Sequence, residues 1–185
     1  MRKLIISLVI LFLLISEGKT QTPTNGIYRI TKLSLKGNFS FADARLLQLM
    51  SSRPPSLRQR VLDRAELPPY TETLIENDLK QLIRFYRQEG FLDAVAIVAE
   101  KRINEKKHTV ALVIEVIEGI PIKVESVAID FDLHKEENQA AFLRSHVLAV
   151  LQLKPGKRFR DESFYRDVDR LQQALADLGY PYARI

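Results

Sequence analysis

One pattern of residues occurs twice in this chain, and this internal repeat limits the possible folds more than any other feature. When the sequence from Tyr70 onward is placed over the sequence from Phe159 onward, apolar, acidic and glycine positions coincide. The coinciding pairs are Ile75 and Phe164, Asp78 and Asp167, Leu79 and Val168, Leu82 and Leu171, Tyr86 and Leu175, Gly90 and Gly179, Phe91 and Tyr180, and Ala94 and Ala183. A period of about 90 residues is too long for a solenoid repeat and indicates a duplicated small domain.

The first copy predicts an α+β unit in the order strand, helix, helix, strand, strand. Residues 30–36 alternate between apolar and polar, as a half-buried strand does. Capping boxes that begin at Ser40 and Thr73 predict two helices, and Gly90 ends the second. The Pro-rich connection 51–69 is expected to hold an extra turn or two of helix. Segments 91–99 and 109–117 are almost wholly apolar around a charged loop, which predicts a β-hairpin.

Apolar spacing also predicts which side chains form the core of this unit. We expect both helices on one face of a three-stranded sheet, with seven side chains meeting between the layers. They are Leu33, Leu79, Leu82, Tyr86, Val95, Val113 and Val116.

The second copy follows the same order but stops early. It predicts a strand over 124–131, a helix over about 137–151 and a second helix that ends at Gly179. Because the sequence ends where its second strand should begin, we expect the chain to be a fragment of a longer protein. The expected modules are residues 27–119 and residues 120–185, the latter lacking its third strand.

The N-terminus predicts export. Arg2 and Lys3 precede an apolar run over 4–15, and Ser16 and Gly18 provide small residues at a cleavage position, so residues 1–18 form an expected signal peptide. An uncleaved anchor is the rival interpretation, but a membrane span needs about 20 apolar residues. No cysteine is present, so the modules must be stabilised by their cores alone.

No pattern in the sequence indicates catalysis. The three histidines lack metal-ligand spacing, and neither a phosphate-binding loop nor a nucleophile motif occurs. We therefore predict no enzyme activity, no cofactor and no metal site. The densest basic cluster, Arg53, Arg58, Arg60 and Arg64, has no aromatic residues interleaved to stack bases, so we interpret it as a solvated face and expect no nucleic acid.

An ordered set of short motifs carries a resemblance to a known family. Leu35-Lys36-Gly37-Asn38 ends the first strand, Asp78-Leu79 leads to Tyr86 and the run Gly90-Phe91-Leu92-Asp93-Ala94-Val95, and Glu118-Gly119-Ile120-Pro121 closes the unit. Gly156, Phe159 and the run 179–183 repeat part of the set. Together these residues resemble the POTRA domain, the polypeptide-transport-associated module, over nearly all of residues 28–185.

A signal peptide before tandem POTRA modules is similar to the outer-membrane assembly factors of the BamA and TamA type. The resemblance implies a location at the periplasmic face of the outer membrane and unfolded outer-membrane proteins as clients. Periplasmic chaperones or accessory lipoproteins are further candidate partners. The family's C-terminal β-barrel is absent from this sequence. A two-partner secretion transporter and a stand-alone periplasmic scaffold module remain alternatives.

The resemblance also implies where a client chain would bind. In the family the third strand is central, so the second strand lies at an edge of the sheet. The expected polypeptide-binding edge consists of Phe91, Leu92, Asp93, Ala94, Val95, Ala96, Ile97 and Val98. Edge strands usually carry Lys or Pro as protection, and here only Asp93 is charged. We therefore expect extended clients to pair with this edge by β-augmentation.

Overall fold

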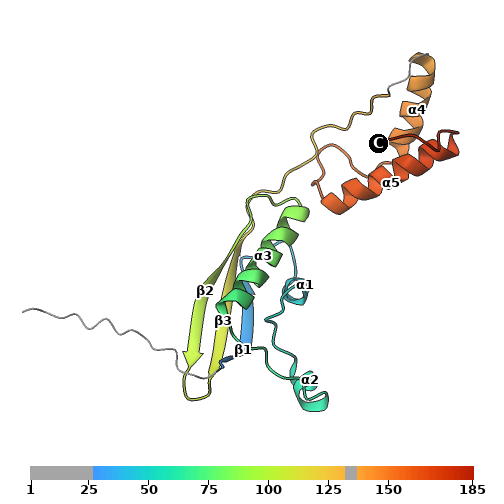
Figure 1. Ribbon diagram of the computed structural model, residues 1–185. Coiled ribbons are helices and arrows are strands. Elements are labelled where there is room, and N and C mark those ends of the chain that lie inside the picture. Colours follow the sequence, from blue (N-terminus) through green and yellow to red (C-terminus); the bar gives the residue numbers. More distant parts are fainter. Residues whose placement is uncertain (1–26, 132–136) are drawn as a thin grey trace, which may run out of the picture.

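The computed structural model describes residues 27–131 and 137–185 (Figure 1). The expected signal peptide at residues 1–18 lies outside the described residues. Two modules follow one another along the chain. Each contains the long helix that the internal repeat predicts, which is residues 72–88 in the first module and residues 161–177 in the second.

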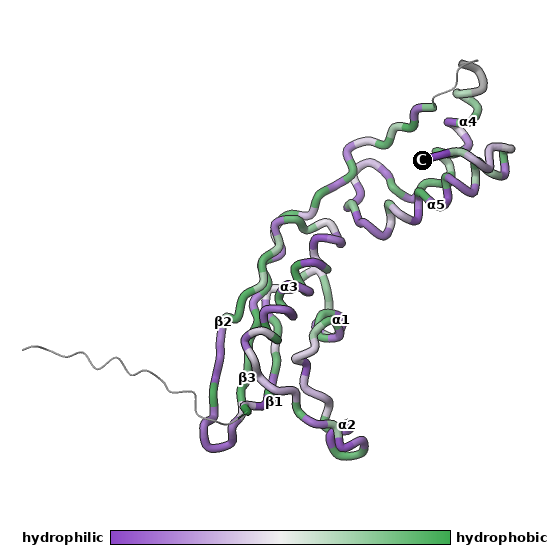
Figure 2. Tube along the Cα trace, in the orientation of Figure 1, coloured by the Kyte–Doolittle hydropathy of each residue, from purple (hydrophilic) through white to green (hydrophobic). Residues whose placement is uncertain are grey.

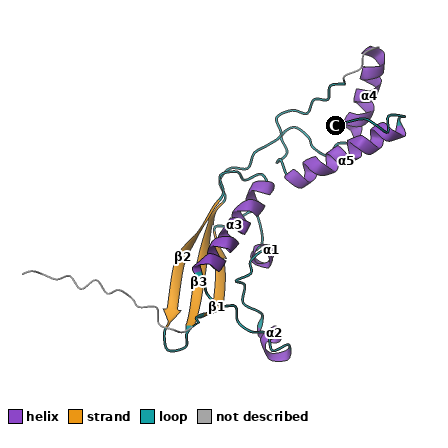
Figure 3. Cartoon of the chain, viewed as in Figure 1, coloured by secondary structure: helices purple, strands orange, loops and turns teal. Residues whose placement is uncertain are grey.

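A three-stranded sheet forms one layer of the first module (Figure 3). Its strands are β1 (Arg29–Lys36), β2 (Val95–Asn104) and β3 (Thr109–Ile117). The order is β1-β3-β2, with β1 parallel and β2 antiparallel to β3. The mixed sheet with a central third strand confirms the predicted fold class.

Three helices connect β1 to β2: α1 (Asp43–Gln48), α2 (Leu57–Leu62) and α3 (Glu72–Gln88). Helices α1 and α3 cover one face of the sheet, whereas α2 projects from the end of the module (Figure 1). The extra helical turns expected in the connection are therefore confirmed as α2.

Both predicted capping boxes at α1 and α3 were misplaced. The N-cap of α1 is Ala42, which has no side-chain cap, because the Ser40 hydroxyl instead donates a hydrogen bond to Glu118. Thr71 rather than Thr73 caps α3, with its hydroxyl oxygen accepting the Leu74 N–H at 3.1 Å. The helix therefore begins two residues before the position that the sequence predicts, with Glu72 as its first residue.

The core of the first module lies between the sheet and helices α1 and α3. Along β3 every second residue is buried, and this row faces the helices: Val110, Leu112, Ile114 and Val116. Leu33, Leu82, Tyr86 and Val116 join this core and Leu79 packs at its margin, as predicted. Val95 and Val113 do not, because strand alternation places them on the other face of the sheet.

Helices α4 (Glu137–Val150) and α5 (Asp161–Asp177) make up most of the second module. The strand predicted over 124–131 is wrong as an element, since only an isolated bridge joins Lys123 to Arg158. An extended segment becomes a strand only when another strand satisfies its backbone, and none among the described residues does so here. A hollow of about 530 Å³ lies between α4, α5 and the segment around Ile129.

Hydrogen bonds show that the two copies of the repeat share their local structure. Asp78 on α3 accepts the N–H groups of Ser51 and Ser52, and Asp167 on α5 accepts those of Gln152 and Leu153. In both modules an acidic side chain on the long helix, α3 or α5, thus holds the segment that follows α1 or α4.

Candidate functional site: the edge of strand β2

Strand β2 begins later and ends later than the sequence indicates. It runs over Val95–Asn104, so Lys101 and Arg102, which were expected in the hairpin loop, belong to the strand. Of the predicted edge residues, Val95, Ala96, Ile97 and Val98 lie in β2. The others, Phe91, Leu92, Asp93 and Ala94, precede it.

The segment before β2 positions the strand rather than forming part of it. Phe91 is buried in the core, and its N–H donates to the Tyr86 carbonyl at 2.9 Å. A turn follows, in which the N–H of Ala94 donates to the carbonyl of Phe91. These contacts tie the start of β2 to the end of α3.

The outer edge of β2 is a free edge of this sheet. No other strand in the described part of the chain pairs with it. The opposite edge, on β1, is partly covered: Arg29 bridges Pro69, the Ile30 N–H donates to Pro68 and the Tyr70 N–H donates to Tyr28. Within the described residues, a second extended chain would therefore find unpaired backbone groups along the length of β2, and on β1 only beyond Ile30.

Two features protect part of this edge. A β-bulge interrupts the pairing with β3 between Val98 and Glu100, and bulges twist an edge away from further pairing. Beyond the bulge the edge carries Glu100, Lys101 and Arg102. Residues 95–98, which we call the β2 strip, are left without charge, bulge or proline.

Side chains of the β2 strip point to both faces of the sheet. Ala96 is buried beneath the helices, whereas Val95 and Ile97 are 45% and 44% exposed on the open face. Ile117, which pairs with Val95, extends this apolar surface across β3. The strip can therefore offer a paired strand both backbone hydrogen bonds and apolar side-chain contacts.

Glu118, directly after β3, is the acceptor of a hydrogen-bond cluster whose partners the sequence did not indicate. Its carboxylate accepts the N–H and hydroxyl of Ser40 at 2.8 and 2.6 Å and the hydroxyl of Tyr86 at 3.0 Å. Burial and then the hydrogen bond to this carboxylate raise the pKa of Tyr86. The cluster fastens the end of β3 to α3 and to the start of α1.

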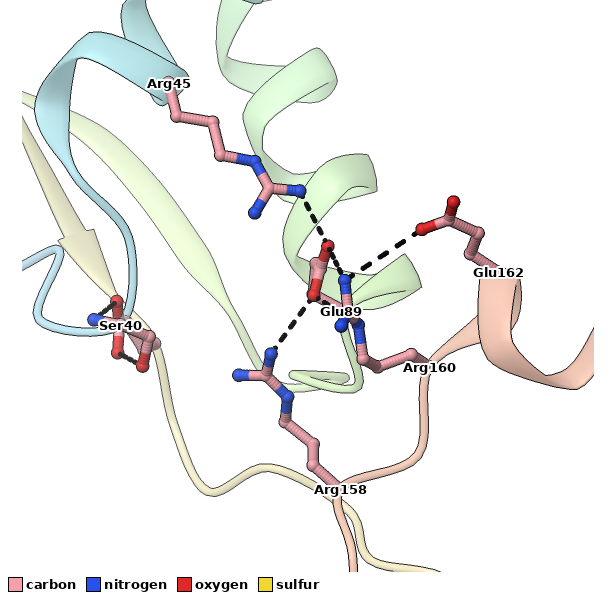
Figure 4. A network of polar contacts seen from close by, with 7 residues as sticks. Ser40, Arg45, Glu89, Arg158, Arg160 and Glu162 are labelled. Carbon is pink, nitrogen blue, oxygen red and sulfur yellow. Dashed lines mark hydrogen bonds and ion pairs between the residues drawn. The ribbon is translucent and has the colours of Figure 1, made fainter. Parts of the chain in front are cut away.

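Glu89 joins the two modules (Figure 4). Its side chain, only 8% exposed, pairs with Arg45 of the first module at 3.0 Å. From the second module Arg158 approaches it at 3.1 Å and Arg160 at 2.9 Å. One buried carboxylate thus lies among three guanidinium groups that come from both modules.

Backbone contacts bring the modules together at the same place. The N–H of Ile122 donates to the carbonyl of Gly90, and the N–H of Phe159 donates to the carbonyl of Ile122. Gly90 has a φ of +89°, and a Cβ there would lie 2.3 Å from the Phe159 carbonyl oxygen. Only glycine can both end α3 and admit the second module this closely.

The sequence contains one weak indication of the structural roles of Glu89 and Glu118. Glu89 and Glu118 each precede a glycine, Gly90 and Gly119, and both glycines have positive φ. In this chain both acidic residues at such turns are buried. Their partners, however, are distant in sequence and could not be read from this pattern.

The described residues contain neither a candidate metal site nor a helix that could span a membrane. No cluster of histidine and acidic side chains there is arranged to hold a metal ion. None of the helices in that part of the chain has the length and hydropathy to cross a membrane.

Comparison with known proteins supplies the family. The model of the POTRA family, described as surface antigen variable number repeat, matches residues 28–119 and 136–185. The outer membrane protein assembly factor BamA of Neisseria meningitidis serogroup B is 24% identical over 171 residues. That alignment covers 92% of this chain and 19% of the relative, so the chain spans about a fifth of its length.

Solved structures give weaker matches. The crystal structure of POTRA domains 3–5 of Haemophilus influenzae BamA has a TM-score of 0.44 and 21% identity, covering 84% of this chain and 57% of that one. CdiB from Escherichia coli has a TM-score of 0.35 and 13% identity, covering 86% and 24%. Neither similarity is close enough to support a functional argument.

Proposed function

Because this chain belongs to the POTRA family, we propose that it is the periplasmic polypeptide-binding region of an outer-membrane β-barrel assembly factor. Its clients are unfolded outer-membrane proteins, which it holds in extended form. The similarity to BamA of Neisseria meningitidis over nearly the whole chain supports this choice over a secretion transporter or a stand-alone scaffold.

The observation that carries the proposal is the free edge of β2. Unfolded clients differ in sequence but share a backbone, so a site that pairs with backbone groups accepts many of them. The β2 strip provides such groups beside exposed Val95 and Ile97. The bulge and the charges after Val98 confine pairing to the strip and limit self-association through the rest of the edge.

A matched pair of substitutions tests this proposal. Ile97→Lys places a charge on the β2 strip, whereas Ser34→Lys adds the same charge on the same face of the sheet at the β1 edge. We expect Ile97→Lys to weaken binding of peptides from outer-membrane proteins about tenfold, because it replaces an apolar contact beside the edge with a charge. Binding by Ser34→Lys should stay within about twofold of the unsubstituted chain.

Proline substitution gives an independent test of the backbone. Val98→Pro removes one donor from the strip, and Val98 is a better choice than Ala96, which is packed beneath the helices. Circular dichroism checks that each variant is folded. If folded Ile97→Lys and Val98→Pro both bind peptides as tightly as the unsubstituted chain, pairing at this edge is not the mechanism.

A further inference from the structure

Helix α2 exposes its apolar side chains to solvent. Leu57 and Val61 are each 76% exposed, and Leu62 is 66% exposed. No residue of this helix is buried. A short helix in a globular domain usually turns its apolar residues toward the core, so this arrangement indicates a surface that another body covers.

The helix is nevertheless well formed. Ser56 and Gln59 make a reciprocal capping box, and the N–H groups of Asp63 and Ala65 both donate to the Gln59 carbonyl. Isolated helices of this length are marginal in water. Its local hydrogen bonds therefore maintain a helix that gains almost nothing from packing on its own module.

Four exposed arginines lie within α2 or within four residues of it in the sequence: Arg53, Arg58, Arg60 and Arg64. None of them forms an ion pair within residues 27–131 and 137–185. Of the two acidic residues in the same connection, Glu66 pairs with Arg29 at 3.5 Å. The surface of α2 thus combines exposed aliphatic groups with positive charge that has no ion-pair partner among the described residues.

A second basic projection lies toward the same end of the module. Figure 1 shows α2 and the β2–β3 turn at the end opposite the second module. Hydrogen bonds at the start of β1 also place the two segments near each other. Arg29 donates to the carbonyl of Leu67, in the connection that holds α2, and to the carbonyl of His108, in the β2–β3 turn. The turn carries exposed Lys106 and Lys107, and hydrophilic and hydrophobic residues are mixed along α2 (Figure 2).

We propose that α2 and the β2–β3 turn dock this end of the first module on an anionic phospholipid surface. Aliphatic residues beside unpaired arginines are the chemistry of helices that lie in the membrane interface. A protein partner is less suited, since α2 is a small convex tip, its connection has no aromatic anchor before Tyr70, and stable protein interfaces need about 800 Å² per partner. This inference rests on the proposed location beside the outer membrane.

Sedimentation with lipid vesicles tests the proposal, using the chain without its expected signal peptide. It should bind vesicles of phosphatidylcholine mixed with phosphatidylglycerol, bind pure phosphatidylcholine far less, and release as salt is raised. Arg58→Gln/Arg60→Gln should weaken binding roughly tenfold or more. Leu57→Ser/Val61→Ser should weaken it about tenfold, and neither pair should disturb the fold because all four side chains are exposed.

Matched controls lie at other exposed positions. Arg84→Gln/Arg87→Gln on α3 removes the same charge, and Ile120→Ser/Val150→Ser removes exposed aliphatic groups outside α2 and the β2 strip. Both should bind vesicles within about twofold of the unsubstituted chain. No binding to anionic vesicles, or equal loss in the controls and the α2 variants, overturns the proposal. Binding of client peptides at β2 should be unchanged in the α2 variants, so failure here leaves the proposed function standing.

Discussion

Four buried acidic side chains tie together segments that lie apart in the sequence. Asp78, Glu89, Glu118 and Asp167 are all buried, and each accepts hydrogen bonds or ion pairs from segments distant in sequence. A buried carboxylate without such partners would be costly. Each therefore fixes a connection that apolar packing alone would leave free to move.

Asp167 makes the stability of the second module sensitive to acid. Burial alone would raise its pKa, but the N–H groups of Leu153 and Gln152 and the guanidinium of Arg170 outweigh it, so the pKa lies below its usual value. The unfolded chain therefore binds this proton more readily than the folded chain. The stabilisation is complete above the unfolded pKa of about 4 and is lost as the pH falls through the folded value.

We predict that Asp167→Asn destabilises the second module by about 1–3 kcal/mol at neutral pH. The same substitution should flatten the acid dependence of its stability below about pH 4. Urea titrations followed through the NMR signals of α5 measure both effects. An unchanged midpoint at neutral pH would show that the bonds to Gln152 and Leu153 do not hold the module together.

Leu82 provides the corresponding test for the apolar core. It is fully buried between α3 and the sheet. We predict that Leu82→Ala costs about 2–5 kcal/mol in the free energy of unfolding of the first module. Leu57→Ala on exposed α2 should change that free energy by less than about 0.5 kcal/mol in thermal or denaturant unfolding. Equal midpoints for the two variants would contradict the assigned core face of α3.

At the scale of elements, apolar periodicity predicted most of the fold. The spacing of Ile75, Leu82 and Tyr86 located α3, and the alternation around Leu33 located β1. Two strands were misjudged because strand limits depend on pairing. Lys101 and Arg102 look like loop residues but are held in β2 by Leu112 and Ala111 of β3.

The candidate site was predictable only in outline. Sequence placed an edge strand after Gly90 and identified residues 95–98 within it. It could not show the bulge at Val98, the cover over β1 or the depth of Phe91 in the core, since all three depend on residues distant in sequence. The ion pairs of Glu89 could not be predicted for the same reason, because Arg158 and Arg160 lie in the other module.

At the scale of the whole molecule, the arrangement of the two modules depends on the joint around Glu89 and Gly90. We predict that Glu89→Gln loosens it, since three arginines would then face one another without the carboxylate. The cost should be about 1–3 kcal/mol, below that of a fully buried pair because the arginines are partly solvated. The chain has no cysteine, so spin labels can be placed at exposed Lys80 and Gln172 through introduced cysteines.

Distances between these labels should be narrowly distributed in the unsubstituted chain and broad in Glu89→Gln. Glu76→Gln, an exposed change on the same helix, is the matched control and should keep the narrow distribution. A broad distribution in the unsubstituted chain would contradict a semi-rigid joint. If the distance distribution is as narrow in folded Glu89→Gln as in the control, Glu89 does not hold the joint.

Residue-by-residue hydrogen exchange tests the proposed polypeptide-binding edge most directly. The backbone amides of the labelled chain are followed with and without an unfolded peptide from an outer-membrane protein. If a client pairs with β2, amides of residues 95–98 that point away from β3 gain protection when the peptide is added, while those of β1 do not change. Peptide binding that leaves every amide of residues 95–98 unchanged would contradict the account.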